Sequence, residues 1–419
     1  MKLPVHYGWI VVALAFTTTL VVAGVRSAPA VFIVPLEAEF GWNRAEIASA
    51  ISLNLLMFGM AAPLSGWLID RYGPRTVMLG GVLMLGLGIS GTLMLQSLWQ
   101  LVLFWGILVG LGAGASGSVL SATIATRWFV ARRGLVLGLL SSGTSTGQLI
   151  FIPQLMLIVV TMGWRAGSAF LACACAVMLL PILLWMRNDP AAIGAQPFGA
   201  GGSESAAARQ ADAAPRIGIR EAARTREFWL LALSFFACGA TTNGLVGTHL
   251  IPHSIDHGIP EVTAAATVGV MGGMNFIGTL LSGYLTDRVD PRKLLACYYV
   301  FRGLSLFALP FVTDFAGLMI FAVVYGLDWF ATVPATVAIT ANRFGRRSIG
   351  SIYGWIFLSH QIGSAMAAVS AGAIRVWLGD YQMAFIAGGC IALVGAGMAL
   401  LVRTPSRAPL VDVSRAAAA

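Results

Sequence analysis

Twelve apolar runs, each of about twenty residues, make up most of this 419-residue chain. A run of that length, coiled as an α-helix, crosses a hydrocarbon layer of roughly 30 Å and satisfies its own backbone hydrogen bonds. The runs are too long for the short alternating strands of a membrane barrel. We therefore predict an all-α integral membrane protein with twelve transmembrane helices, centred near residues 20, 57, 85, 112, 146, 176, 239, 274, 302, 329, 362 and 392.

The composition agrees with lipid as the solvent. Hydrophobic residues are 58% of the chain, charged residues are 10%, and the mean hydropathy is +0.83, so a soluble domain could not cover its apolar surface with a polar coat. The net charge of +9 does not indicate nucleic-acid binding, because the basic residues stand at the ends of apolar runs and do not form one patch with aromatic residues. We expect the lipid bilayer as a partner, with no nucleic acid and no obligate protein partner.

A ten-residue string from Gly66 to Arg75 returns almost unchanged from Gly283 to Arg292, which indicates an internal duplication. A fainter echo at a similar spacing links residues 127–129 with residues 343–344. We therefore predict two pseudo-symmetric six-helix halves, related as parallel repeats about an axis along the membrane normal. Such halves favour transport by alternating access.

A polar insert at residues 188–226 separates the halves, and its Ala, Gly and Ser with scattered charges are typical of a flexible linker. We divide the chain into an N-terminal half at 1–187, this linker, a C-terminal half at 227–403 and a tail at 404–419. Most of the 26 basic residues fall on one side of the predicted spans. By the positive-inside rule, we expect a cell-membrane protein whose termini and linker are all cytoplasmic.

The string Gly66–Arg75 matches the pattern Gly-x-x-x-Asp-Arg-x-Gly-x-Arg that the major facilitator superfamily carries between its helices 2 and 3, and the chain resembles that superfamily throughout. Within it, the chain is similar to the monocarboxylate transporter and oxalate/formate branch at residues 7–9, 26, 128–134 and 163–165. The resemblance implies the major facilitator fold and a secondary active transporter that moves a small organic anion, such as a monocarboxylate, with protons. The alternative is a facilitator or efflux transporter for another small amphipathic solute.

The chain departs from the animal members of that branch in helix 8. Where those members have an Asp and, four residues later, an Arg, this sequence has Asn275 and Thr279. The usual carboxylate-binding arginine and its proton partner are therefore missing from these positions.

Arg26 is the first candidate for binding an anionic substrate. A charge inside a membrane span is costly unless it faces a wet cavity or a partner, and a guanidinium offers two parallel hydrogen bonds to a carboxylate. The alternative is an arginine near the outer end of helix 1 that reaches the interface or pairs with Glu37 or Glu39. Polar residues of other spans, each of which could equally join two helices, complete the predicted substrate-binding set: Asn54, Gln148, Asn243, Asn275 and His360.

Arg302 and Asp328 lie near the middle of consecutive antiparallel spans, so their depths match and they can form a buried pair. Asp328 is the candidate proton carrier, with Arg302 as its partner and His249 as a second proton-coupling candidate. The alternative is that the pair only fixes helix packing. Histidines recur every four residues from His249 to His257, but a Pro and a Gly interrupt that helix, so we predict no metal site.

The repeated cytoplasmic loops form a predicted conformational latch that does not touch substrate. Its acidic residues can meet the positive N-terminal end of a helix in the other half, and its glycines permit a tight turn and close helix contacts. The alternative is that its charges only fix the orientation in the membrane. The predicted latch residues are Gly66, Asp70, Arg71, Gly73, Arg75, Arg127, Arg133, Gly283, Asp287, Arg288 and Arg292.

The sequence carries no pattern typical of an enzyme. It has no nucleophile motif, nucleotide-binding loop or metal-ligand constellation, and the linker is too small and polar to fold as a catalytic domain. The five cysteines all lie inside apolar runs without Cys-x-x-Cys spacing, and we interpret them as reduced packing residues. We therefore predict no catalytic residue, no metal and no cofactor.

Overall fold

The computed structural model describes residues 6–130, 132–200, 217–286, 288–345 and 349–403. The N-terminal half consists of α1 (Tyr7–Phe40), α2 (Arg44–Thr92), α3 (Leu98–Leu101), η1 (Val102–Val109), α4 (Gly110–Ala115), α5 (Ser118–Trp128), α6 (Arg133–Met162) and α7 (Trp164–Trp185). The linker contributes the short η2 (Ala191–Ile193) and α9 (Ile219–Ala222). The C-terminal half consists of α10 (Arg226–Gly239), η3 (Ala240–Val246), α11 (Gly247–Asp256), α12 (Glu261–Thr286), α13 (Pro291–Ala308), η4 (Leu309–Phe311), α14 (Phe315–Asp328), α15 (Thr332–Phe344), α16 (Ile349–Leu378) and α17 (Gln382–Leu401).

Eleven helical segments among the described residues are long and apolar enough to cross a membrane. A further helix, α16, has 30 residues and carries the polar Ser359, His360 and Gln361 near its centre. Each of the predicted span centres lies in one of these segments, and α2 supplies two of them because it bends at Gly73. The prediction of an all-α membrane protein built from two six-helix halves is confirmed.

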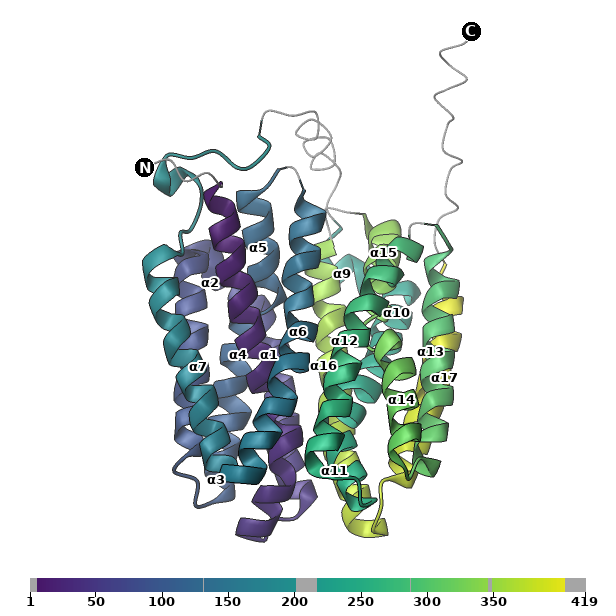
Figure 1. Ribbon diagram of the computed structural model, residues 1–419. Helices are drawn as coiled ribbons and strands as arrows, with labels where there is room; N and C mark the ends of the chain where they lie inside the picture. Colours follow the sequence, from purple (N-terminus) through teal and green to yellow (C-terminus); the bar gives the residue numbers. More distant parts are fainter. Residues whose placement is uncertain (1–5, 131, 201–216, 287, 346–348, 404–419) are drawn as a thin grey trace.

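The two halves stand side by side, purple to teal beside green to yellow in Figure 1. They contact each other along α2 with α16, α6 with α12, and α1 with α11. Glycines permit close approach at these contacts: a Cβ on Gly372 would meet the backbone of Arg44, and one on Gly272 would meet the backbone of Ser145. The start of α1, the end of α17 and the linker helix α9 lie at one end of the bundle (Figure 1). We name this the linker end and the opposite one the distal end.

The fourth and tenth spans, which occupy equivalent places in the two halves, are both interrupted. The fourth span breaks at Ser116 and Gly117, between α4 and α5, and the tenth at residues 329–331, between α14 and α15. The second break has a local cause, because Pro334 in the first turn of α15 cannot donate a backbone hydrogen bond and its ring would clash with the carbonyl of Phe330 in a continuous helix. Backbone freed inside a membrane must find partners in the protein or line a cavity.

The first part of the linker, residues 188–200, packs against the N-terminal half. The Phe198 backbone N–H donates to the Trp128 carbonyl over 2.9 Å, and the Val130 N–H donates to the Phe198 carbonyl over 2.9 Å. The Phe198 ring packs edge-on to Trp9. This part of the linker is therefore attached to the loop between α5 and α6, whereas residues 201–216 of the linker and the predicted tail at 404–419 lie outside the described residues.

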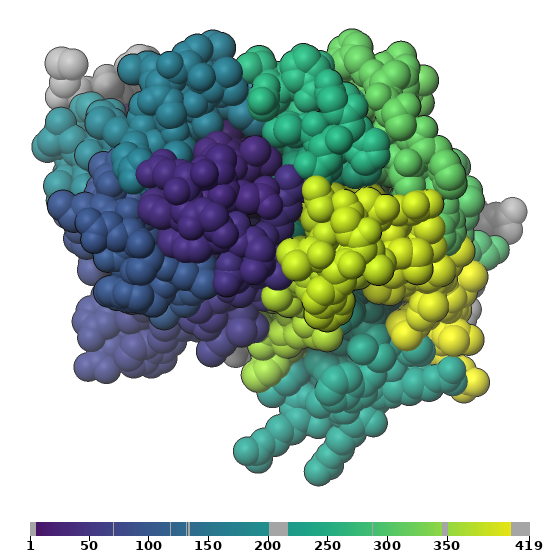
Figure 2. All heavy atoms as spheres, turned by 90° about the horizontal axis from the view of Figure 1, so that it is seen from below, coloured from purple at the N-terminus to yellow at the C-terminus, as the bar shows by residue number. Residues whose placement is uncertain are grey.

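An ion-pair cluster joins the two halves at the distal end, and we name it the distal seam: Glu37, Arg44, Asp256, Arg375 and Tyr381. The Arg44 guanidinium, almost fully buried, holds the Asp256 carboxylate with two bonds of 2.5 and 2.8 Å and also donates to Glu37 over 2.9 Å. Arg375 donates to the same carboxylate over 3.0 Å, and the Tyr381 hydroxyl lies 3.3 Å from Arg44. Seen from this end, the purple turn between α1 and α2 packs against the yellow-green turn between α16 and α17 (Figure 2). The seam fastens the halves at the distal end.

We predict that Asp256→Asn opens the distal end more often, because it removes the carboxylate that holds Arg44 of the other half. Hydrogen bonds to charged groups are worth about 1.5–3 kcal/mol, so the distal-open population should rise by roughly tenfold or more. The measurement is the rate at which a membrane-impermeant thiol reagent, added at the distal side, labels Thr248→Cys in a cysteine-free background.

The matched control is Asp314→Asn, because Asp314 caps α14 at the distal end within the C-terminal half alone. The control should label Thr248→Cys at the parental rate. An Asp256→Asn rate equal to the parental rate would show that the seam does not hold this end closed.

Candidate functional site

A cavity of about 50 Å³ lies between the two halves. The N-terminal half lines it with residues of α1, α2 and α6, and the C-terminal half lines it with residues of η3, α11, α12 and the break between α14 and α15. Its polar lining includes Arg26, Ser27, Asn54, Thr144, Gln148, Asn243 and Thr248, and its apolar lining includes Ile51, Leu55, Ile152, Val268, Trp329 and Phe330. The cavity therefore combines one fixed positive charge with amide, hydroxyl and apolar groups from both halves.

Arg26 is the charged residue of this cavity, and its side chain is partly exposed to it. The guanidinium carbon lies 3.8 Å from the centre of the Phe58 ring, and the buried Nε has no hydrogen-bond partner. Among the described residues, no acid pairs with Arg26, because Glu37 bonds to Arg44 and Glu39 bonds to Arg165 over 2.6 Å. An anion entering the cavity would find this guanidinium free to donate.

Two further polar atoms of the cavity wall are buried without a partner. They are the Oε1 atom of Gln148, from α6, and the indole Nε1–H of Trp329, from the break in the tenth span. An unpaired buried polar group is costly, so each favours a ligand that can donate to Gln148 or accept from Trp329. Trp329 was not among the predicted site residues, although a Trp in mid-span is unusual, since Trp prefers the membrane interfaces.

Four of the six predicted substrate-binding residues line the cavity together: Arg26, Asn54, Gln148 and Asn243. Asn54 also donates from Nδ2 to the Trp105 carbonyl over 2.7 Å, which fixes its side chain against the fourth span. His360 does not line this cavity. Its buried ring stacks on Phe357 and contacts Phe235, and its Nδ1 lies 3.3 Å from the Gln361 amide.

Asn275, the sixth predicted residue, lies beside the cavity and joins the two halves. Its Nδ2 donates to the Ser145 hydroxyl of α6 over 2.7 Å, and its Oδ1 accepts from the Phe330 backbone N–H over 3.1 Å and from Thr279 over 3.1 Å. The side chain is fully buried. Asn275 therefore ties α12 to the other half and to the broken backbone of the tenth span.

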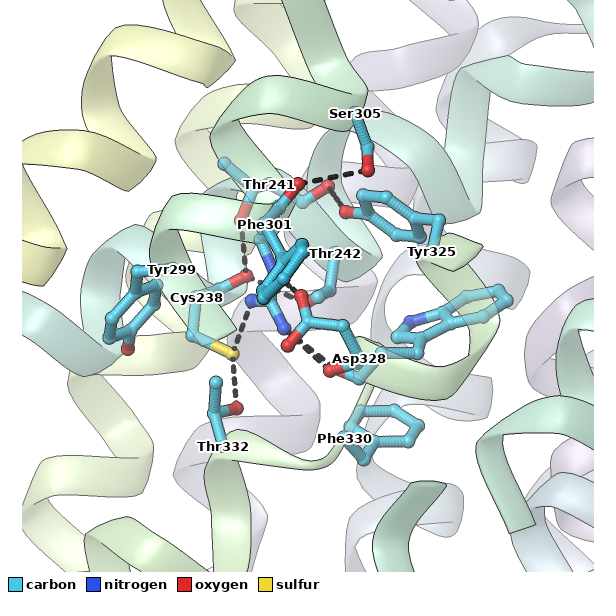
Figure 3. A network of polar contacts seen from close by, with 12 residues as sticks. Cys238, Thr241, Thr242, Tyr299, Phe301, Ser305, Tyr325, Asp328, Phe330 and Thr332 are labelled. Carbon is cyan, nitrogen blue, oxygen red and sulfur yellow. Dashed lines mark hydrogen bonds and ion pairs between the residues drawn. The ribbon is translucent and has the colours of Figure 1, made fainter. Parts of the chain in front are cut away.

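The expected contact between Arg302 and Asp328 is present. Asp328 is the last residue of α14, directly before the break of the tenth span (Figure 3). Arg302 donates from Nε to the Asp328 carboxylate over 2.7 Å, and from Nη2 to the carbonyls of Asp328 and Trp329 over 2.9 and 3.1 Å. Its Nη1 donates to the Cys238 sulfur over 3.0 Å, and that sulfur lies 3.1 Å from the Thr332 hydroxyl. The fully buried guanidinium thus satisfies two carbonyls at the break, while the Asp328 Oδ1 keeps no partner.

His249 lies towards the distal end, outside the lining of the cavity. Its Nε2 is 2.8 Å from the Ala368 carbonyl, and its Nδ1 is 3.3 Å from the hydroxyl of Tyr381, a residue of the distal seam. His253 is buried on the next turn, with its ring 4.9 Å from that of Phe385. In the part of the chain that the structure describes, no group of three metal-ligating side chains is gathered.

Three of the described latch residues, Gly73, Arg75 and Arg292, serve turns and contacts inside their own halves. Gly73 has a φ of 81°, which glycine adopts without strain, and forms the turn that joins the second and third spans. Arg75 donates to the Leu183 carbonyl over 2.6 Å, and Arg292 donates to the Val402 carbonyl over 3.0 Å. The Arg292 side chain also bonds to Asp290 in the same loop, and this hydrogen bond lowers the pKa of the Asp290 carboxyl.

The remaining latch residues divide into three groups. Arg71 packs over the rings of Trp67 and Tyr72, and Arg288 lies 3.6 Å from the Tyr284 ring centre. Gly66, Gly283 and Arg127 lie in α2, α12 and the last turn of α5. Asp287 and the side chains of Asp70 and Arg133 lie outside the described residues. The latch stays a prediction.

The family model of the Major Facilitator Superfamily matches residues 14–368 and 274–418 of the chain. The chain is 24% identical over 406 residues to the uncharacterized MFS-type transporter YcxA of Bacillus subtilis (strain 168), covering 92% of each protein. It is 26% identical over 408 residues to monocarboxylate transporter 11 of Homo sapiens, covering 93% of this chain and 81% of that protein.

Two solved structures share the fold. A bacterial homolog of the human lysosomal transporter Spinster, in an inward-facing and occupied conformation, has a TM-score of 0.75 at 14% identity and covers 96% of this chain and 97% of its own. A D-xylose-proton symporter has a TM-score of 0.71 at 13% identity and covers 95% of this chain and 98% of its own.

We predict that Arg302→Leu strongly destabilises the protein, because it leaves the buried Asp328 carboxylate and two backbone carbonyls without a donor. Removing one partner of a buried pair costs about 3–5 kcal/mol of the free energy of unfolding. The measurement is the thermal unfolding midpoint of the purified protein in detergent. The double variant Arg302→Leu/Asp328→Leu should regain part of the loss, since it leaves no unpaired charge.

The control is Arg165→Leu, which removes a half-exposed pair with Glu39 at the distal end. An exposed pair is worth about 0–1 kcal/mol, so this variant should unfold near the parental temperature. If Arg302→Leu were as stable as Arg165→Leu, the pair would not be what holds the break of the tenth span.

Proposed function

Because the chain belongs to the Major Facilitator Superfamily, we propose that it is a secondary transporter that moves a monocarboxylate together with a proton. Its family and fold are those of multi-pass membrane transporters, which are not enzymes. The free guanidinium of Arg26 in the cavity between the halves is the observation that carries the proposal. Relatives named as monocarboxylate transporters support the substrate class.

A carboxylate fits the donors of the cavity. Arg26 offers charge-assisted hydrogen bonds from the N-terminal half, and the Trp329 indole N–H offers a neutral one from the C-terminal half. A bound carboxylate would accept from both and so connect the halves, while the apolar lining from Ile51, Leu55 and Val268 would receive a short carbon chain. Substrate sites between repeats and beside discontinuous helices are typical of transporters of this architecture.

Asp328 is the proposed proton carrier. Its Oδ1 is buried without a hydrogen-bond partner, so a proton can be added there while Oδ2 keeps its bond to Arg302. The next residue in the chain, Trp329, lines the cavity. A change in the Arg302–Asp328 bond would therefore act directly on the backbone that carries the Trp329 donor.

We propose the cell membrane as the location and the linker end as the cytoplasmic end. The support is the distribution of positive charge at the linker end, where Arg71 and Arg75 flank the bend of α2 at Gly73 and Arg288 and Arg292 flank the connection from α12 to α13. Under this orientation the distal seam faces the outside, and the cavity exchanges substrate with the two sides in turn.

We predict that Arg26→Ala lowers uptake of radiolabelled L-lactate, pyruvate or acetate into proteoliposomes by roughly tenfold to a hundredfold. The reason is that hydrogen bonds to a charged group contribute about 1.5–3 kcal/mol, and the cavity lining holds no second cation among the described residues. Arg26→Lys should keep part of the uptake, because it keeps the charge without the planar fork.

Arg165→Ala is the control, because it removes an arginine of the same half that lies outside the cavity. Transport of none of the three monocarboxylates by the parent, or parental uptake by Arg26→Ala, would overturn the proposal. Transport of a neutral amphipathic solute in that case would support a facilitator or exporter.

We predict that Asp328→Asn separates binding from proton coupling. The amide keeps the size of the side chain and can still accept from Arg302, but it cannot take up a proton. An inward proton gradient should no longer accelerate uptake of the monocarboxylate, while exchange of labelled for unlabelled substrate should continue. Gradient-driven accumulation at the parental level would remove Asp328 from the mechanism.

A further inference from the structure

A row of aromatic rings connects Arg26 to the contact between the two halves. The Arg26 guanidinium lies 3.8 Å from the centre of the Phe58 ring in α2. Phe58 packs edge-on against Phe357 in α16, with 5.9 Å between the ring centres and 65° between the ring planes. Phe357 in turn stacks on His360, at 5.8 Å and 6°. The residue that binds the substrate in the proposed function is therefore one side chain away from the opposite half.

The position of Phe58 places this contact between the cavity and the linker end. On α2, Arg44 belongs to the distal seam, Asn54 and Leu55 line the cavity, and Phe58 follows one turn later on the same face. The same order holds on α16, where Arg375 lies in the seam and Phe357 lies towards the linker end. The seam therefore bounds the cavity on one side, and the contact between Phe58 and Phe357 bounds it on the other.

Phe58 packs tightly at the place where the two halves meet. Its ring is 8% exposed, and its neighbour Gly59 lies so close to α16 that a Cβ there would overlap the Gln361 side chain. The ring is held between a cation of its own half and an aromatic residue of the other half. A movement of the guanidinium therefore removes a contact from the ring at the place where the halves meet.

We propose that Phe58 is a positioning residue that couples occupancy of the carboxylate site to the contact between the halves, an inference that rests on the proposed function. Without substrate, the guanidinium packs on the Phe58 ring and supports its contact with Phe357. A carboxylate draws the guanidinium into the cavity, because charge-assisted hydrogen bonds are stronger than a cation–π contact. The ring then loses its partner and the halves separate more readily at the linker end.

The test is Phe58→Leu, which keeps an apolar side chain but removes the ring. Since the guanidinium no longer has a competing partner, KM for the transported monocarboxylate should fall by roughly threefold to tenfold. The second measurement is thiol labelling of Ala62→Cys, one turn further towards the linker end. In the protein that keeps Phe58, the labelling rate should rise when substrate is added. In Phe58→Leu it should be high with and without substrate.

Two variants accompany this test. Phe58→Tyr keeps the ring and should restore both the parental KM and the substrate-dependent labelling. Phe32→Leu is the matched control, because Phe32 is also buried in the same half but packs on Trp105 and not on Arg26. This variant should keep the parental KM and the parental labelling response even if it is less stable.

The outcomes separate this inference from the function on which it rests. A parent that neither transports L-lactate, pyruvate or acetate nor changes its labelling with them overturns both. A parent that responds, together with a Phe58→Leu variant of unchanged KM and unchanged substrate-dependent labelling, overturns the role of Phe58 alone.

Discussion

The hydrocarbon of a membrane supplies no hydrogen bonds, and this constraint governs where polar groups of the bundle lie. A buried polar atom that the protein does not satisfy is costly unless it faces a cavity where water or a ligand can satisfy it. The protein satisfies Arg302, because Asp328, Cys238 and two carbonyls at the break of the tenth span take up its donors. The unpaired atoms of Arg26, Gln148 and Trp329, in contrast, all belong to residues that line one cavity.

The same criterion distinguishes three arginines of the described helices, Arg26, Arg44 and Arg302. Arg44 and Arg302 are both fully engaged, one across the halves in the distal seam and one inside the C-terminal half. Their charges hold the fold together and have no donor to spare for a ligand. The Arg26 guanidinium, in contrast, bonds to no acid among the described residues and lies 3.8 Å from the centre of the Phe58 ring, a contact that a carboxylate can replace. The two buried charged groups to which we assign a function, Arg26 and Asp328, each keep one atom without a hydrogen-bond partner.

The fold could be read from the sequence far better than the site could. Apolar runs fix the spans because their length must match the bilayer, and the contact of Arg302 with Asp328 could be predicted because consecutive antiparallel spans place equal depths side by side. The roles of Asn275 and Trp329 could not, because they depend on the break at residues 329–331 and on the register between α6 and α12. Pro334 is the local sign of that break, but nothing in the sequence pattern says which side chain the broken backbone turns towards the cavity.

The contacts on the two sides of the cavity differ in chemistry. Because of this difference, bound substrate acts on the contact on the linker side and not on the distal seam. The distal seam consists of ion pairs whose members already have partners, so a substrate carboxylate at Arg26 takes no contact away from it. The contact between Phe58 and Phe357 shares the Arg26 guanidinium with the binding site, so the same carboxylate acts on it directly. Binding can shift a conformational equilibrium only through contacts that differ between the two states. In this bundle the Arg26 guanidinium supplies such a contact between the cavity and the linker end. The distal end must be released by other means, because the charged groups of the distal seam bond to one another.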